Sequence, residues 1–229
     1  MVLLHSPLVG VESWGALAAV LGRAGMEAAA PAVGGDEQAP FAERYVRGAV
    51  DGVLRAAGPA GRPVLVGHSG AGPLLGAVGS GLRERERPVG GYLFCDAGLP
   101  RAGASRLDPL AAEDPVMAAA FRVELERGGR FPEWDDADLA PLVPDPEARA
   151  ALLGSLRPRG LAFFTEPLPA ARWPDAPCGY LRLSGAYDRW AEEAAAESWP
   201  VAALDAGHFH PLVDPDGVAA ALLGVLARM

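Results

Sequence analysis

A serine in a glycine-rich turn carries the most specific chemical signal in the sequence. The segment PVLVGHSGAGPLL, residues 63–75, places Ser69 directly after a short apolar run and directly before an apolar segment with helical spacing. A serine on so tight a strand-to-helix turn has a strained backbone and needs small neighbours. Gly67, Gly70 and Ala71 meet this need, although glycine is more usual at the last of these positions. We therefore predict that Ser69 is a nucleophile; the alternative is a tight turn that binds a phosphate at the helix N-terminus.

A serine hydroxyl reacts only when a base removes its proton, and a histidine near the C-terminus has the right place for this role. The segment LDAGHFHPLVDP, residues 204–215, places His208 after an apolar run and shortly before the last helix. His210 is the rival base, but the adjoining Pro211 favours a packing role for it. The two histidines could also bind a metal ion, yet the sequence offers no cluster for a third ligand. We predict His208 as the general base, with no metal ion and no organic cofactor.

The base needs a carboxylate that fixes its tautomer, and two aspartates compete for this role. Asp188 ends the segment LRLSGAYD, residues 181–188, and Asp96 lies in YLFCDAGLP, residues 92–100. Each follows an apolar run, so each is placed just past the end of a predicted strand. Nucleophile, acid and base then follow the chain order Ser, Asp, His. We favour Asp188 and keep Asp96 as the alternative acid. A helix cap or a loop anchor is the structural reading for either residue.

These residues must be positioned by strands and helices that alternate along the chain. Short apolar runs predict strands at 2–4, 26–30, 64–66, 91–95, 180–183 and 201–204. Alternation with helical segments favours a mostly parallel sheet of about six strands with helices on both faces. Residues 99–172 interrupt the alternation and are rich in proline, acidic residues and aromatic residues. We predict an α/β core at 1–98 and 173–229, and an inserted helical lid at 99–172.

Composition limits the classes of partner. The chain has 229 residues, 50% of them hydrophobic, and a formal net charge of −9, so one large core is possible and the average field repels nucleic acid and anionic membranes. Cys95 and Cys178 lack metal-ligand spacing and are predicted to be buried free thiols. The sequence shows no signal peptide and no membrane-spanning run. We expect a cytoplasmic protein that binds a small, apolar molecule; the oligomeric state cannot be read from the sequence.

Taken together, the serine turn, the aspartate loops and the histidine loop resemble the α/β-hydrolase superfamily. The opening segment LLHSPLVGVESW, residues 3–14, is most similar to the His-Gly-x segment of the hydroxynitrile lyase and methylesterase branch, including a tryptophan at the corresponding spacing. The resemblance covers the chain except the insertion. It implies the α/β-hydrolase fold, beginning at the third strand of the usual sheet.

The resemblance also implies an oxyanion hole with two backbone N–H donors. The donor after the nucleophile is Gly70, whereas the residue after His-Gly corresponds to Pro7, which has no N–H. Ser6 stands where glycine is usual. Three arrangements stay open: Leu8 donates from a shifted loop, Ser6 contributes its hydroxyl, or the hole has one good donor. His5 and His68 are expected to support these two loops.

The residues thus predict a serine-dependent hydrolase of a carboxylic ester or thioester, with an acyl-enzyme at Ser69. A second hypothesis keeps the fold but uses His208 for proton transfer in a lyase, cyclase or isomerase, and the missing N–H of Pro7 supports it. A third is a small-molecule binding protein without turnover.

Overall fold

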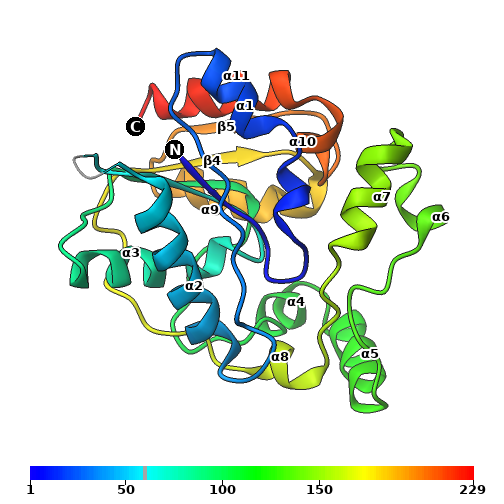
Figure 1. Ribbon diagram of the computed structural model, residues 1–229. Helices are drawn as coiled ribbons and strands as arrows, with labels where there is room; N and C mark the ends of the chain where they lie inside the picture. The colour runs from blue at the N-terminus through cyan, green and yellow to red at the C-terminus, as the bar shows by residue number, and fades with distance from the viewer. Residues whose placement is uncertain (59–60) are drawn as a thin grey trace.

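The computed structural model describes residues 1–58 and 61–229. Five parallel strands form one sheet in the order β1-β2-β3-β4-β5 (Figure 1). The strands are β1 Val2–Leu4, β2 Val64–Ser69, β3 Gly91–Ala97, β4 Cys178–Arg182 and β5 Val201–Ala203. Neighbouring parallel strands need crossover connections, and helices supply them here. The predicted α/β architecture is confirmed.

The run at 26–30 forms only part of the strand that was predicted there. Val2 pairs with Ala29 in a single parallel bridge, and the Leu3 N–H donates to the Ala29 carbonyl oxygen over 2.8 Å. The run reads Met-Glu-Ala-Ala-Ala and contains no β-branched residue, so little favours a longer ladder at this sheet edge. An extended edge segment therefore replaces the sixth strand.

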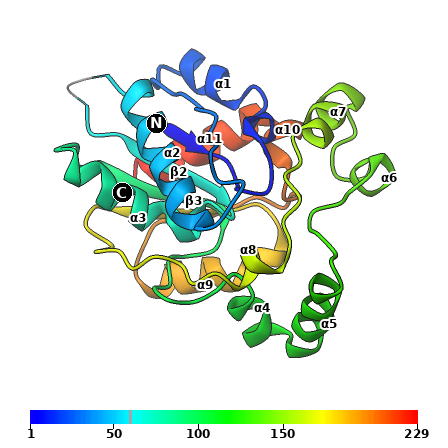
Figure 2. The same ribbon diagram turned by 60° about the horizontal axis from the view of Figure 1, so that its bottom comes forward.

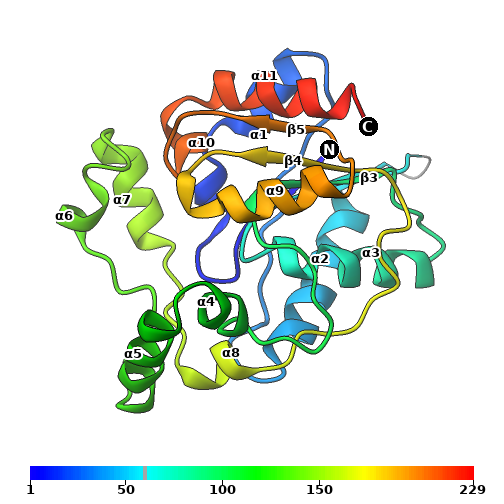
Figure 3. The ribbon, with the colours of Figure 1, turned by 180° about the vertical axis from the view of Figure 1, so that it is seen from behind.

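Helices cover both faces of the sheet, as Figures 1 and 3 show. On one face, side chains of α2, α3 and α9 pack against Leu65, Phe94 and Tyr180. On the other face, α1 and α11 pack against Val66 and Leu93. The core helices are α1 Leu17–Arg23, α2 Phe41–Ala56, α3 Leu75–Glu84, α9 Asp188–Ala196, α10 His210–Val213 and α11 Pro215–Leu226. Three short 3₁₀ helices are η1 Val11–Trp14, η2 Gly72–Leu74 and η3 Gly185–Tyr187.

The segment between β3 and β4 carries five helices beside the sheet (Figure 2). They are α4 Asp108–Glu113, α5 Pro115–Glu126, α6 Asp136–Leu139, α7 Pro146–Gly154 and α8 Leu161–Thr165. Two apolar clusters attach them to the core. One contains Phe163 and Phe164 packed against Leu8, and the other contains Leu139 packed with Val9. Both clusters reach the loop that follows β1.

Several smaller expectations can be compared with the structure. The segment Asp214-Pro215 is typical of a helix start, and the Asp214 side chain indeed accepts from the Gly217 N–H at the start of α11. Cys95 and Cys178 are buried free thiols, and burial raises the pKa of both. None of the helices in the described residues is long and apolar enough to cross a membrane.

Candidate active site

Ser69 ends β2 in the backbone conformation that the turn motif predicts. Its φ angle is +56°, in the left-handed region, and the Ala71 N–H closes the turn by donating to the His68 carbonyl oxygen over 3.0 Å. A Cβ atom on Gly67 would lie 2.9 Å from the Leu75 side chain, so this position has no room for a larger residue. The surrounding residues hold this strained turn in place. The sharp turn presents the Ser69 hydroxyl at the carboxyl end of the sheet.

The partner of His208 is Asp96. The His208 Nδ1 atom lies 2.7 Å from Asp96 Oδ2. Asp96 is fully buried at the end of β3, with a φ angle of +45°. Its Oδ1 accepts the N–H groups of Leu183 and Ser184 over 2.8 and 2.9 Å, and its Oδ2 accepts the Ser184 hydroxyl over 2.6 Å. Burial alone would raise the pKa of Asp96, but the hydrogen bonds with His208 and Ser184 outweigh burial and hold it below its usual value.

This contact contradicts the preference for Asp188 as the partner of His208. Asp188 begins α9, and its side chain is 60% exposed. Its Oδ1 lies 3.2 Å from Nε of Arg182 on β4. The loop after β4 instead turns the backbone N–H groups of Leu183 and Ser184 toward Asp96. Asp96 at the end of β3 therefore makes the contact with His208 that was expected of Asp188 after β4.

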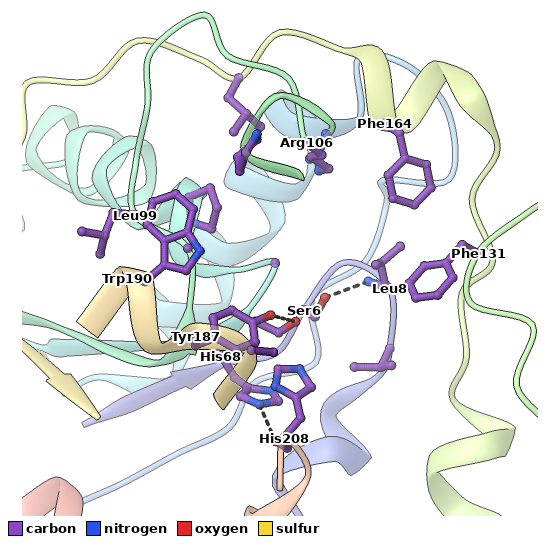
Figure 4. A pocket seen from close by; sticks show the side chains of 18 of the residues that line it. Ser6, Leu8, His68, Leu99, Arg106, Phe131, Phe164, Tyr187, Trp190 and His208 are labelled. Atoms are coloured by element: carbon purple, nitrogen blue, oxygen red, sulfur yellow. Dashed lines mark hydrogen bonds between the residues drawn. The ribbon is translucent and has the colours of Figure 1, made fainter. Parts of the chain in front are cut away.

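Aromatic rings enclose the imidazole of His208 (Figure 4). The Tyr187 ring stacks on it with centroids 5.1 Å apart, and the His68 ring lies 4.4 Å away. The His68 Nε2 atom contacts the His208 carbonyl oxygen over 3.0 Å and must carry a proton to do so, because a carbonyl only accepts. Burial is the main cause that lowers the pKa of His68 to about 3, and the nearby His208 contributes to this shift. A neutral His68 leaves Asp96 as the charged neighbour of any imidazolium formed at His208.

Tyr187 also contacts the nucleophile. Its hydroxyl lies 3.5 Å from Ser69 Oγ, and burial raises the pKa of Tyr187 to about 12, so the phenol is neutral near pH 7. Among residues 1–58 and 61–229, no hydrogen bond joins Ser69 to His208. Catalytic hydrogen bonds are often long or misaligned before substrate binds, so this geometry alone does not rule out His208 as the base for Ser69.

The loop after β1 brings Ser6 against the turn that follows Ser69. The Leu8 N–H donates to Ser6 Oγ over 3.3 Å, and a Cβ atom on Gly70 would lie 2.9 Å from the same oxygen. Of the three predicted arrangements, donation by Leu8 is therefore disfavoured, because the Leu8 N–H already donates to Ser6 within the same loop. The Ser6 hydroxyl proton is left available beside Gly70, whose N–H has no acceptor in the part of the chain that the structure describes.

Buried groups fix this loop from beneath. The His5 Nδ1 atom lies 2.9 Å from the Ser6 carbonyl oxygen, and its Nε2 accepts the Val33 N–H over 3.0 Å. Burial is the main cause that lowers the pKa of His5. The Arg157 N–H donates to the Leu8 carbonyl oxygen over 2.8 Å. His5 thus contacts the loop after β1, whereas His68, next to Ser69, contacts the loop that carries His208.

A cavity of about 440 Å³ opens above these groups. Ser6, Ser69, Gly70 and His208 line it, whereas His210 begins α10 and is absent from the lining that the described residues form. Most of the remaining wall is apolar, including Leu99, Phe131, Trp134, Phe164, Leu168 and Trp190. The same described residues contain no group of three or more His, Cys, Asp or Glu side chains suited to hold a metal ion. The arrangement suits attack by Ser69 on an apolar molecule.

A sequence model described as "Alpha/beta hydrolase family" matches residues 1–221. The chain belongs to this family. Similar solved structures include an extracellular alpha/beta-hydrolase from a Paenibacillus species, with a TM-score of 0.76 and 18% identity over 98% of this chain and 97% of that chain. Polyneuridine aldehyde esterase has a TM-score of 0.71 and 19% identity over 98% of each chain. Tomato methylketone synthase I, crystallised as a variant with beta-ketoheptanoate, has a TM-score of 0.68 and 14% identity over 99% of this chain and 96% of that chain. At these identities the likeness shows the fold alone. A search of curated protein sequences gives no significant match.

Sequence reasoning about this α/β-hydrolase missed Tyr187. The residue lies one position before Asp188, inside the segment considered for the acid. A tyrosine next to a predicted helix start has no spacing that marks it as part of a site. Its role follows only from η3, which turns its ring onto His208 and its hydroxyl toward Ser69.

Proposed function

We propose that this α/β-hydrolase is a serine-dependent hydrolase of carboxylic esters or thioesters that forms an acyl-enzyme at Ser69. The observation that carries the proposal is the 2.7 Å contact between Asp96 and His208, at a pocket that Ser69 enters from a strained turn. An esterase and a synthase share this fold, so the fold does not choose the reaction and the residues of the site must do so.

The Asp96 carboxylate sets the direction of proton transfer. Because its pKa is lowered, Asp96 is ionised near pH 7 and only accepts hydrogen bonds. The Nδ1 atom of His208 therefore carries a proton, and Nε2 presents a lone pair. This tautomer can take the proton of Ser69 as Oγ forms a bond to the carbonyl carbon of the ester.

The protonated imidazole then returns the proton to the leaving alcohol or thiol as the bond from the carbonyl carbon to that group breaks. An acyl group remains on Ser69 Oγ. Water attacks this acyl group while His208 accepts a proton from the water. The bond between Ser69 Oγ and the acyl carbon then breaks, Oγ receives the proton from His208, and the carboxylic acid leaves. Asp96 keeps its charge throughout and stabilises the imidazolium.

The negative oxygen that forms in each step needs two donors. The Gly70 N–H supplies one. We assign the second to the Ser6 hydroxyl, because Pro7 has no N–H and the Leu8 N–H already donates to Ser6 Oγ. By accepting that bond, Ser6 Oγ directs its own proton away from Leu8. A hydroxyl donor thus replaces the backbone donor that Pro7 lacks.

Burst kinetics with p-nitrophenyl acetate test the proposal. The wild-type protein should release about one p-nitrophenol per active site before the slower steady state, because this good leaving group makes acylation of Ser69 faster than deacylation. Ser69→Ala and His208→Ala should each abolish the burst while leaving the far-ultraviolet circular dichroism unchanged. A wild-type protein without a burst, or a burst that survives Ser69→Ala, would refute the acyl-enzyme.

One observation favours a second function, namely proton transfer without an acyl-enzyme. Ser69 Oγ lies against the Tyr187 hydroxyl and is not hydrogen-bonded to His208 in the described chain. In a lyase, cyclase or isomerase, these two hydroxyls would bind a substrate oxygen while His208 moves the proton. A fluorophosphonate probe that labels Ser69 in the wild-type protein favours the hydrolase. Turnover of a substrate without any labelling favours the second function.

A further inference from the structure

The charged groups of the active-site pocket are all of one sign. Besides its histidines, the lining contains Arg101 and Arg106 and, among the described residues, no aspartate or glutamate. Figure 4 shows Arg106 across the pocket from Tyr187 and His208, with Trp190 toward one side and Phe164 toward the other. Although the protein has a formal charge of −9, the charged side chains in the lining of this pocket are cationic.

Arg106 is buried and incompletely satisfied. Its side chain is 11% exposed, and its guanidinium lies over the Phe163 ring, 3.8 Å from the centroid. NH1 donates to the Phe163 carbonyl oxygen over 2.9 Å and lies 3.7 Å from Glu166 Oε2. NH2 is buried and has no hydrogen-bond partner within the described residues. An unpaired buried donor on a charged group is costly, so the positive charge of Arg106, a residue of the pocket lining, is only partly compensated within the described residues.

The carboxylates near Arg106 are committed elsewhere. Both oxygens of Glu166 accept backbone N–H groups at the start of α2, from Phe41 over 2.7 Å and from Ala42 over 2.8 Å. Asp36 is fully buried and contacts Arg159 over 3.0 Å and Arg157 over 3.7 Å.

This cluster thus has three guanidinium groups and two carboxylates, and it carries a net positive charge behind the pocket wall. Burial lowers the pKa of Arg106 to about 10, so the side chain remains charged near pH 7.

Arg101 provides an internal contrast. It lines the same pocket, but its NH2 contacts Glu193 Oε2 over 2.6 Å and its guanidinium lies 5.0 Å from the Trp190 ring centroid. Its side chain is 41% exposed. Its charge is paired and screened by water, and it offers no vacant buried donor.

We propose that the pocket takes substrates with an apolar body that ends in a carboxylate, and that the guanidinium group of Arg106 binds this carboxylate. The proposal rests on the proposed ester or thioester hydrolysis for the reacting bond and adds the class of substrate. The aromatic walls contact the apolar body, while Ser69 and Arg106 lie on opposite sides of the cavity. A charge-assisted hydrogen bond in this desolvated place is stronger than one in water and supplies the counter-charge that the cluster lacks.

Binding of a matched pair of probes to Ser69→Ala tests the proposal without turnover. The probes are 4-phenylbutyrate and 4-phenylbutyramide, which have the same shape and differ in charge. Isothermal titration calorimetry should show tighter binding of the carboxylate by about tenfold to a hundredfold, as expected for a hydrogen bond to a charged group. Adding Arg106→Met should remove this preference, whereas adding Arg101→Met should preserve it.

A further variant moves the preference in the opposite direction. Glu166→Gln removes the anionic neighbour of Arg106 and should increase the carboxylate preference, an effect that damage to the pocket would not produce. Arg106→Lys retains the charge and should keep a reduced preference if Arg106→Met fails to fold. Equal binding of the two probes by Ser69→Ala, or a preference that survives Arg106→Met because the carboxylate binds at Gly70, would overturn the proposal.

The two proposals fail separately. A Ser69-dependent burst with p-nitrophenyl acetate, together with equal binding of the two probes, would leave the hydrolase intact and reject the carboxylate site. A carboxylate preference that depends on Arg106, without any burst, would support the binding site and reject the acyl-enzyme.

Discussion

Replacing Asp96 by asparagine distinguishes the aspartate that contacts His208 from Asp188, the acid favoured on sequence grounds. In Asp96→Asn, the amide oxygen can keep the two backbone N–H groups of Leu183 and Ser184 that Oδ1 accepts now. The amide NH2 then faces His208 Nδ1, at the place where Oδ2 of Asp96 accepts a hydrogen bond in the wild-type protein. Two donors cannot share this contact, so Nδ1 must lose its proton and Nε2 must gain one. His208 in this tautomer cannot accept the proton of Ser69.

The size of the loss follows from the tautomer. The same substitution in a serine protease triad lowers kcat about 10⁴-fold while the geometry is kept, and about 1.4 kcal/mol of activation free energy corresponds to each tenfold change. We expect a loss of about 10³- to 10⁴-fold in kcat for p-nitrophenyl acetate, or about 4 to 5.5 kcal/mol. KM should change little, because Asp96 is buried behind His208 and does not line the pocket.

Asp188→Asn is the matched control for this experiment. Its ion pair with Arg182 is partly exposed and is worth at most about 1 kcal/mol of stability, so kcat should stay within about twofold of the wild-type value. Initial rates over a range of substrate concentrations give both parameters for both variants. A large loss of kcat in Asp188→Asn with retained activity in Asp96→Asn would refute the assignment of Asp96.

Three further predictions concern the groups around Ser69. Ser6→Ala removes the assigned oxyanion donor and should lower kcat by about 10²- to 10³-fold with little change in KM; a change below threefold would contradict the assignment. Tyr187→Phe removes the hydroxyl that draws Ser69 from His208, so fluorophosphonate labelling should accelerate by about two- to tenfold, whereas a large loss would indicate a direct role in the reaction. His68→Phe tests acid stability: the folded pKa of about 3 lies below the ordinary 6.5, so the unfolded chain binds the extra proton and stability falls as pH drops through this interval. The melting temperature of the variant should fall less steeply between pH 6 and 4, and equal slopes would argue against a neutral His68.

Much of the fold was predictable because the relevant signals are local. The apolar runs that became the five strands are short and bounded, and Asp214 marks the start of the last helix by its own side chain. The serine turn was predictable for the same reason, since its small neighbours adjoin Ser69 in sequence. The run at 26–30 shows the limit of this approach. Alanines are apolar enough to suggest a strand, but they do not favour a long ladder at an edge.

The choice of acid was not predictable in this way. Asp96 and Asp188 both follow apolar runs, and nothing next to either residue separates them. The deciding groups are the N–H groups of Leu183 and Ser184, which lie 87 and 88 residues from Asp96 in sequence. They approach it because β3 and β4 are neighbours in the sheet. Both aspartates also lie between Ser69 and His208 in sequence, so the chain order Ser, Asp, His does not separate them.

The segment between β3 and β4 contributes to the reaction as well as to the pocket wall. The backbone N–H of Arg157 donates to the Leu8 carbonyl oxygen, and the side-chain NH2 of Arg159 lies 3.4 Å from the Pro7 carbonyl oxygen. Both arginines belong to the predicted insertion, yet they bind the loop that carries Ser6. The position of Ser6, the proposed second oxyanion donor, therefore depends on this segment, and so does the position of Arg106. Because one segment sets both the donor and the far end of the pocket, changes within it should alter kcat together with KM, whereas an independent lid would alter mainly KM.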